Sequence, residues 1–563
     1  MAVTWKKLAY VDADHGGLTG LSDDDHPQYA FLAGRTGGQT LISSIDSGGN
    51  LTLQSTAHAT KGKILFGTSA YDEVNNRLGI GTTSPATTLD VAGDVSFNKY
   101  KAVAMACDNG TSFPASPNTG QWFYRTDIDT LFIYEAAWKS IISFGAVTLY
   151  VDGTNGSDAI GQGYGSGAGA TATIQYAINL IPPINGGNVI VNVAAGTYAE
   201  TVTIQGKMYS GSYGINLNGV LTQLLTATID SGVSGTGATQ GSITDAGAFT
   251  SSVTTTVDAD SAAAQKILNV ASTTNFAVGD TVLINSGGAR QEVIRVASIQ
   301  AGVSLTAAAN LVYLHTALQA DVVEVCKYAG KLVYALSYYR VIDYNTANTL
   351  VITGTYNGIT PTGTYYIYDW GSIVAPSSGT AMSVINGQQA ITFNHLSFAT
   401  TAHPNSALYI DKLSTVTAYY CYFNGRIYML NSAVSYIYNC LVSHTLTGQG
   451  FYIVVGSNAN IYQSKITGCN SGFNSIILSG NAILTVFQGS IIENGATATI
   501  YAIQNSIVSF SNLVGFGYNR LRNTPTCILA TIGSLVQATA NLVYENYTTA
   551  KNPAGATDPS YID

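Results

Sequence analysis

The chain has 563 residues and a formal net charge of −9, and only 10% of its residues are charged, against about a quarter in ordinary soluble domains. That length exceeds a single hydrophobic core, so several domains are expected. The absence of any apolar run near the roughly 18–20 residues of a membrane helix argues against membrane insertion, and the acidic balance argues against a nucleic-acid partner.

The N-terminal part divides into two compositional zones. Residues 1–99 are rich in Gly, Thr and Asp and contain short strand-like pieces at 51–53 and 63–66. Residues 100–145 predict a small β module, because aromatic runs at 121–124 and 130–134 flank a turn at 127–130. Two such runs around a short polar turn are typical of a β-hairpin.

The two zones after residue 145 are predicted to belong to a second structural region. Residues 146–221 begin with a Gly- and Ser-rich loop, followed by a helix predicted at 173–181 that Pro182 and Pro183 end. Strands are predicted at 188–193 and 200–204. Residues 222–325, rich in Ala, Thr and Val, are interpreted as an inserted β domain with strands near 281–284 and 292–296.

Residues 326–546 show an irregular repeat, and residues 547–563 form a polar C-terminal tail. The repeat has apolar or aromatic anchors, most with an apolar residue five positions later. The anchors are Ala418, Tyr436, Ile461, Val486, Phe510 and Ala538, and the partners are Phe423, Leu441, Ile466, Ile491, Val514 (displaced) and Val543. Spacings of roughly 18 to 28 residues mark solenoid coils. Short alternating stretches without a helical period favour a parallel β-helix, whose coils bury apolar side chains by stacking.

Four segments carry a resemblance to a known family. Residues 14–29 (DHGGLTGLSDDDHPQY) and 77–93 (RLGIGTTSPATTLDVAG) resemble segments of bacteriophage tail fibres and tailspikes. Residues 113–124 (FPASPNTGQWFY) resemble a small β module of phage structural proteins. Residues 172–200 look like the entry to the pectate-lyase-like β-helix of tailspikes.

The resemblance implies an all-β homotrimer, in which a trimeric β-rich N-terminal shaft precedes a right-handed parallel β-helix with an inserted β domain. It implies a virion location, with other phage structural proteins bound at the N-terminal end. The expected function is a tail fibre or spike that attaches to the host cell surface, by binding surface polysaccharide. Two alternatives stay open: a tailspike depolymerase (hydrolase or lyase), and a head or neck appendage fibre.

Catalysis of polysaccharide cleavage would need acidic residues. Glycoside hydrolases use two carboxylates, about 5 Å apart in retaining enzymes and about 6.5–9.5 Å apart in inverting ones. Residues 326–540 contain four acids, Asp343 and the three weak catalytic candidates Asp369, Asp411 and Glu493. Because these acids are scarce and separated, we prefer to interpret them as members of turns or salt bridges, which favours a protein that is not an enzyme.

Aromatic side chains are the weak candidates for sugar contacts. Tyrosine can stack on a sugar ring and hydrogen-bond through its hydroxyl. The candidates for ligand binding are Trp370, Tyr419 and Tyr422. Tyrosine at alternating positions also packs well in ladders between strands, so most of these rings are expected to be structural.

No cofactor and no metal are predicted. The acids Asp23, Asp24 and Asp25 beside His26 could bind a cation, but capping of turns is the preferred interpretation. The other histidines lack HxH or HExxH spacing. Six cysteines without a CxxC pair predict buried free thiols.

Overall fold

The computed structural model divides into two compact units, residues 1–106 and 107–563, and each is described by itself. The described residues are 42, 47–93, 107–143, 145–209, 213–235, 239–386, 390–400, 405–443, 450–467, 474–487, 489–494, 498–511, 519–530, 534–537, 542–553 and 561–562. The proposed cation cluster at 23–26 lies outside them.

The first unit contains a four-stranded sheet in the order β1-β2-β3-β4. Its strands are β1 (Lys63–Phe66), β2 (Ser69–Asp72), β3 (Arg77–Ile80) and β4 (Leu89–Val91). The prediction of a strand at 63–66 is confirmed, whereas residues 51–53 form no strand. Most apolar side chains of β1 and β3 are exposed in the single chain, including Leu65 and Ile80.

The second unit begins with the small β module. Its strands are β5 (Asp108–Gly110), β6 (Trp122–Arg125), β7 (Thr130–Tyr134) and β8 (Trp138–Ser143), which join β10 (Ile184–Asn185) and β14 (Met208–Tyr209) in one sheet. Strands β6 and β7 pair antiparallel from Trp122↔Ile133 to Arg125↔Thr130, which confirms the predicted hairpin. Phe123, Phe132 and Trp138 form its core.

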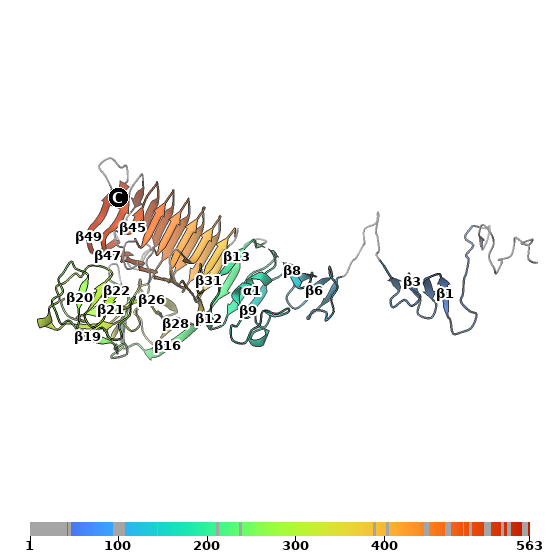
Figure 1. Ribbon diagram of the computed structural model, residues 1–563, viewed down its shortest axis with the longest axis horizontal. Helices are drawn as coiled ribbons and strands as arrows, with labels where there is room; N and C mark the ends of the chain where they lie inside the picture. Colours follow the sequence, from blue (N-terminus) through green and yellow to red (C-terminus); the bar gives the residue numbers. More distant parts are fainter. Residues whose placement is uncertain are drawn as a thin grey trace, which may run out of the picture. The chain divides into compact units, whose positions relative to one another are not determined.

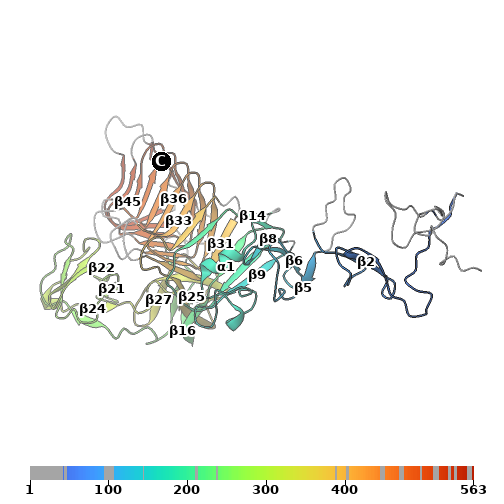
Figure 2. The same ribbon diagram turned by 45° about the vertical axis from the view of Figure 1, so that its right-hand side comes forward.

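The rest of the unit is built on a parallel β-helix with three faces (Figures 1 and 2). Most coils contribute one strand to each face, and each strand pairs in parallel with its counterparts in the neighbouring coils. Face 1 is an 11-stranded sheet. It comprises β9 (Val147–Val151), β11 (Val189–Val193), β15 (Ile215–Asn218), β31 (Ala390–Asn394), β34 (Thr415–Tyr419), β37 (Val434–Tyr438), β40 (Asn458–Tyr462), β43 (Ile483–Phe487), β46 (Ile507–Ser511), β48 (Leu535–Gln537) and β50 (Tyr561–Ile562).

Faces 2 and 3 share the long strand β47 (Asn519–Ala530), along which β49 (Leu542–Pro553) pairs. Face 2 comprises β12 (Gly196–Tyr198), β29 (Ser372–Val374), β32 (Leu396–Ala399), β35 (Tyr422–Asn424), β38 (Leu441–Ser443), β41 (Lys465–Thr467), β44 (Ile491–Glu493) and the first half of β47. Face 3 comprises β13 (Val202–Gln205), β30 (Met382–Ile385), β33 (Ser406–Asp411), β36 (Arg426–Leu430), β39 (Phe451–Val454), β42 (Ile476–Ser479), β45 (Ala498–Ala502) and the second half of β47.

One apolar core runs through the stacked coils. The predicted helix is confirmed as α1 (Ile174–Leu180), with the Thr173 side chain accepting from Tyr176 N as its N-cap. Helix α1 buries Ile174 and Ile178 in the same core as the inward side chains of all three faces. The single coil has no apolar interior of its own, so every coil depends on its neighbours for burial.

Among the anchors that the structure describes, all but one are correct; Ala538 and the displaced partner Val514 lie outside the described residues. The register aligns Ala418 with Ile437, Ile461, Val486 and Phe510, so the anchor at Tyr436 is wrong by one residue. On face 2, Phe423 aligns with Val442, Ile466 and Ile492. The predicted partners Leu441 and Ile491 are therefore wrong by one residue. Both point outward, yet both are buried.

The corners of the β-helix require left-handed backbone. Between faces 3 and 1, successive coils place pairs of residues at positive φ. These pairs are Lys412–Leu413, Asn431–Ser432, Val455–Gly456, Gly480–Asn481 and Gln504–Asn505. Because only Gly and, to a lesser degree, Asn adopt this conformation at low cost, the corners explain why Asn and Gly interrupt the strands.

This geometry predicts the outcome of two substitutions at Asn481. Its φ is 60° and its side chain is exposed. We expect Asn481→Gly to be neutral and Asn481→Val to cost about 1–2 kcal/mol, because a β-branched residue is strained in this region. Thermal unfolding of the two variants measures the difference. Equal melting temperatures would show that the corner does not impose the strain.

The chain leaves the β-helix after β15 and returns at β29. The excursion starts and ends side by side, since Gly371 N donates to Val220 O at 2.7 Å. It contains two sheets. The first inserted sheet comprises β16 (Leu221–Thr228), β17 (Ser231–Val233), β18 (Ser242–Thr244), β25 (Leu332–Ala335), β26 (Tyr338–Asn345), β27 (Thr349–Ile352) and β28 (Thr364–Trp370). The second comprises β19 (Thr254–Thr256), β20 (Ile267–Asn269), β21 (Thr281–Ile284), β22 (Glu292–Gln300), β23 (Ser304–Ala307) and β24 (Val322–Val325).

The excursion is longer than the sequence indicated. The domain boundary was expected at 325, but strands β25 to β28 also belong to the first inserted sheet. These strands are rich in tyrosine, like the coils, and Tyr339 packs beside the β-helix, with its ring centroid 4.7 Å from that of Tyr420. Composition alone therefore did not separate them from the coils.

A buried histidine joins the loops of the second inserted sheet. His315 is fully buried, with Nδ1 2.7 Å from Asp321 Oδ2 and Nε2 3.3 Å from Glu292 Oε2. Arg290 pairs with Asp321 at 2.8 Å. Burial alone would lower the pKa of His315, but hydrogen bonds to and charges of the two carboxylates outweigh it, so the pKa is raised above 6.5.

The network predicts that this sheet loses stability as the pH rises. A histidine whose folded pKa is raised contributes its full stabilisation below the unfolded pKa of about 6.5 and loses it as the pH passes the folded pKa. We expect the hydrogen-exchange protection factors of β22 and β24, which are corrected for the base-catalysed intrinsic rate, to be lower at about pH 8.5 than at about pH 6. His315→Gln removes this pH dependence, whereas replacing the exposed His58 by Gln preserves it. A wild-type protein without the dependence would contradict the prediction.

Candidate functional site

The excursion covers part of the outward surface of face 2. Trp370, at the end of β28, is only 5% exposed; its indole Nε1 donates to Tyr420 O at 2.7 Å, and its ring lies 5.0 Å from that of Tyr422. Leu332, Val341 and Leu441 complete an apolar contact between the first inserted sheet and the β-helix. This contact holds the excursion on face 2.

Four buried charges lie beside that apolar contact. Asp343, from β26, pairs with Lys465 at 2.8 Å and with Arg522 at 2.5 Å. Glu493 pairs with the same two cations, at 3.2 Å and 2.7 Å. Burial alone would raise the pKa of each carboxyl, but the two cations outweigh it and lower both pKa values. Both acids are therefore held ionised, and we call this set the charge cluster.

A pocket of about 260 Å³ lies between the second inserted sheet and face 2. We call it the face-2 pocket. Its walls come from the β21 region, from β22, from the Ala329–Gly330 turn and from β35, β38, β41 and β44. The lining residues are Val278, Gly279, Asp280, Thr281, Arg295, Ala329, Gly330, Tyr422, Leu441, Ser443, Lys465, Thr467 and Glu493.

The polar groups of the face-2 pocket are fixed by hydrogen bonds. The Arg295 guanidinium donates to Ser443 Oγ at 2.6 Å and to Thr467 Oγ1 at 2.9 Å, so it links β22 to two coils. Asp280 accepts from Ala277 N at 2.7 Å. Burial raises the pKa of Asp280, and that hydrogen bond opposes the shift. The pocket thus offers cations, carboxylates, hydroxyls and the Tyr422 ring to one small ligand.

The three catalytic candidates occupy different places. Asp369 lies on the first inserted sheet and forms a half-exposed pair with Lys331. Asp411 ends β33 on face 3, where it accepts from the Tyr409 hydroxyl at 3.0 Å and from Asn431 Nδ2 at 2.7 Å. Glu493 is in the charge cluster. The structure gives no pairing among these three acids.

One ligand candidate, Tyr422, lines the face-2 pocket together with the catalytic candidate Glu493. The second ligand candidate, Trp370, is buried, which leaves little of its ring for a ligand. Sequence reasoning missed Asp280 and Arg295, which lie far from face 2 in sequence. Only an expectation that the insertion folds back on the coils would have pointed to them.

Tyr419 belongs to a stacked ladder on face 1. Ring centroids are 4.9 Å apart from Tyr419 to Tyr438, 4.3 Å from Tyr438 to Tyr462 and 4.0 Å from Tyr462 to Phe487, with interplanar angles of 5–15°. The ladder therefore covers both faces of Tyr438 and Tyr462 and one face of each end ring, Tyr419 and Phe487. Inside the ladder the rings present edges and hydroxyls to solvent, so a sugar could not stack on their faces.

Within the described ranges, no group of three or more His, Cys, Asp or Glu side chains is placed to hold a metal ion. Cys107, Cys326, Cys421 and Cys440 are free thiols. No helix in the described part of the chain is long and apolar enough to cross a membrane.

The fold and pocket define a parallel β-helix protein with an inserted domain that covers part of one face. No model of a protein family and no curated protein matches the chain. Among solved structures, a complex of XylC with xylose is 12% identical with a TM-score of 0.21, and covers 69% of this chain and 68% of that one.

Two tailspikes of Pseudomonas phages also match in structure. The tailspike gp49 of phage LKA1 is 9% identical with a TM-score of 0.13, covering 74% of this chain and 69% of its own. The tailspike gp61 of phage phi297 is 11% identical with a TM-score of 0.14, and the match covers 69% of this chain and 76% of gp61. The fold assignment rests on the strand pairing described above.

Burial of the charge cluster predicts that Asp→Asn lowers the free energy of unfolding more inside the cluster than at the half-exposed Asp369. We expect Asp343→Asn to cost about 3–5 kcal/mol, because it leaves an uncompensated buried positive charge. Asp369→Asn breaks a solvent-screened pair and costs about 0–1 kcal/mol. Unfolding experiments give the free energies, and hydrogen exchange in β26 localises the change. Similar losses in the two variants would contradict the role of burial.

Proposed function

We propose that the protein is a subunit of a virion fibre or spike on a bacteriophage tail, which attaches to the host surface by binding polysaccharide in the face-2 pocket. The observation that carries this proposal is the composition of that pocket. Sugars present both hydrogen-bond donors and acceptors around an apolar ring, and a pocket with the Tyr422 ring, fixed cations and carboxylates suits such a ligand.

The size of the pocket limits the ligand. A volume of about 260 Å³ lies just below the roughly 300–1,000 Å³ of drug-sized ligand sites. One sugar unit, rather than a long segment of chain, would therefore enter it. Weak binding of single units is sufficient if the fibre is a homotrimer, because linked sites raise the overall affinity by about 10²–10⁴.

Depolymerisation is the second candidate function, and one observation favours it. Asp280 and Glu493 line the same pocket, and their pKa values move in opposite directions, upward by burial and downward by the two cations. Such divergence is typical of an acid and a base in glycosidases. Binding is preferred because both oxygens of Glu493 are already paired with Lys465 and Arg522.

Attachment predicts that filling the pocket abolishes glycan binding. Val278 lies on the pocket wall and is 45% exposed, so Val278→Trp introduces bulk without disturbing a core. We expect the purified full chain to bind members of an array of bacterial surface polysaccharides, and this variant to bind at least about tenfold more weakly. Val233→Trp, at a similarly exposed valine outside the pocket, is the matched control.

The same assay separates the candidate functions. Retained binding without released reducing ends supports attachment. Release of reducing ends that Asp280→Asn abolishes would instead establish the depolymerase. Equal binding by wild type and Val278→Trp would remove the face-2 pocket from the proposal, and failure of every polysaccharide to bind would overturn polysaccharide attachment itself.

A further inference from the structure

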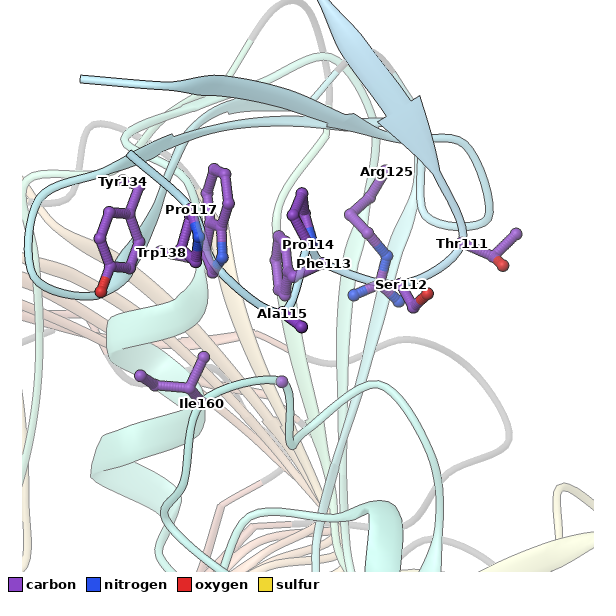
Figure 3. A pocket seen from close by; sticks show the side chains of 11 residues that line it. Thr111, Ser112, Phe113, Pro114, Ala115, Pro117, Arg125, Tyr134, Trp138 and Ile160 are labelled. Atoms are coloured by element: carbon purple, nitrogen blue, oxygen red, sulfur yellow. The ribbon is translucent and has the colours of Figure 1, made fainter. Parts of the chain in front are cut away.

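A larger pocket lies at the opposite end of the second unit, where the small β module meets the start of the β-helix. Its volume is about 460 Å³. Figure 3 shows the loop at 111–117 along one side and Ile160 across from it. The lining residues are Thr111, Ser112, Phe113, Pro114, Ala115, Pro117, Arg125, Tyr134, Trp138, Ile160 and Gly161. We call this the module pocket.

One wall of the module pocket is apolar and rigid. The Phe113 and Trp138 rings stack in parallel, with centroids 4.8 Å apart and an interplanar angle of 10°. Tyr134 packs against Trp138 at 5.3 Å. Pro114 and Pro117 further stiffen the loop, because proline fixes φ. A wall held in place in this way binds a ligand without a large ordering cost.

The cation in the module pocket is fixed and already neutralised. Arg125 donates from Nε and Nη2 to the two oxygens of Asp127, at 2.8 Å and 2.7 Å. Its guanidinium also stacks on the Phe113 ring, 4.9 Å from the centroid. Arg125 lowers the pKa of Asp127, so the carboxylate stays ionised beside it. A neutral acceptor therefore suits this guanidinium better than a second carboxylate or a phosphate.

The rim supplies hydroxyls. Thr111 and Ser112 are exposed at one side, and the Tyr134 hydroxyl stands at the other. Hydroxyls donate and accept, which matches a ligand that does the same. A proline-rich peptide would offer mainly carbonyl acceptors to this rim, so it uses fewer of these groups.

We propose that the module pocket binds a neutral hexose unit. The ring of the sugar lies against the Tyr134 and proline wall, and its hydroxyls meet Arg125 and the rim. The proposal rests on the attachment function for its biological meaning, and it adds a second, separate sugar site near the base of the β-helix. The pocket volume is within the range of small-ligand sites.

Titration of the full chain with glucose, galactose and mannose, one at a time, tests the site by saturation-transfer NMR and tryptophan fluorescence. We expect at least one hexose to bind saturably with a dissociation constant of about 1 mM. Ile160→Glu, at a residue 57% exposed, and Tyr134→Ala should each weaken it by about tenfold or more. Trp122→Ala, 51% exposed on the same module and outside the pocket, should leave it unchanged.

Several outcomes overturn the inference. No saturable binding of any of the three hexoses, or binding unaffected by both Ile160→Glu and Tyr134→Ala, refutes a hexose site here. Binding of a proline-rich peptide that Ile160→Glu and Tyr134→Ala both abolish, together with no binding of any hexose, would assign the pocket to a protein partner. Val278→Trp distinguishes the two sites, because it blocks the face-2 pocket and leaves hexose binding in the module pocket intact.

Discussion

Stacking of one coil on the next is the interaction on which the rest of this structure depends. A single coil has no interior, so its inward side chains become a core only when parallel strands pair with the coils on either side. Backbone pairing fixes the repeat along the axis at about 4.8 Å. Side chains at equivalent positions therefore lie in columns, and each column is limited to residues that tolerate a neighbour at that distance.

The same spacing decides where a ligand can bind. On face 1 it brings aromatic rings into face-to-face contact from Tyr419 to Phe487, which covers the ring faces of Tyr438 and Tyr462 that a sugar would need. Concave sites arise where the chain departs from the stack. The face-2 pocket lies under the excursion, and the module pocket lies where the β module meets the first coil. Both binding hypotheses therefore concern the junctions of the β-helix.

The sequence predicted the periodic parts of the fold well and the junctions poorly. Helix α1, the hairpin and most anchors follow from local patterns. Leu441 and Ile491 were assigned inward because they are apolar, but both point outward and are buried, Leu441 beneath the excursion. Tyr422 and Glu493 were named from the sequence, whereas Asp280 and Arg295 reach them only through tertiary contact, which no local pattern encodes.

The repeat also explains why so weakly charged a chain buries four charges at one junction. Equivalent side chains repeat from coil to coil, so the outer surface of face 2 is similar at neighbouring coils. Apolar contacts such as Trp370 on Tyr422 therefore fix the register of the excursion on face 2 only weakly. Lys465, Glu493 and Arg522 lie on three successive coils of face 2, and Lys465 and Arg522 pair with Asp343 in a single register. A displacement by about 4.8 Å would bury unpaired charges, each costing several kcal/mol, and would also dismantle the wall of the face-2 pocket.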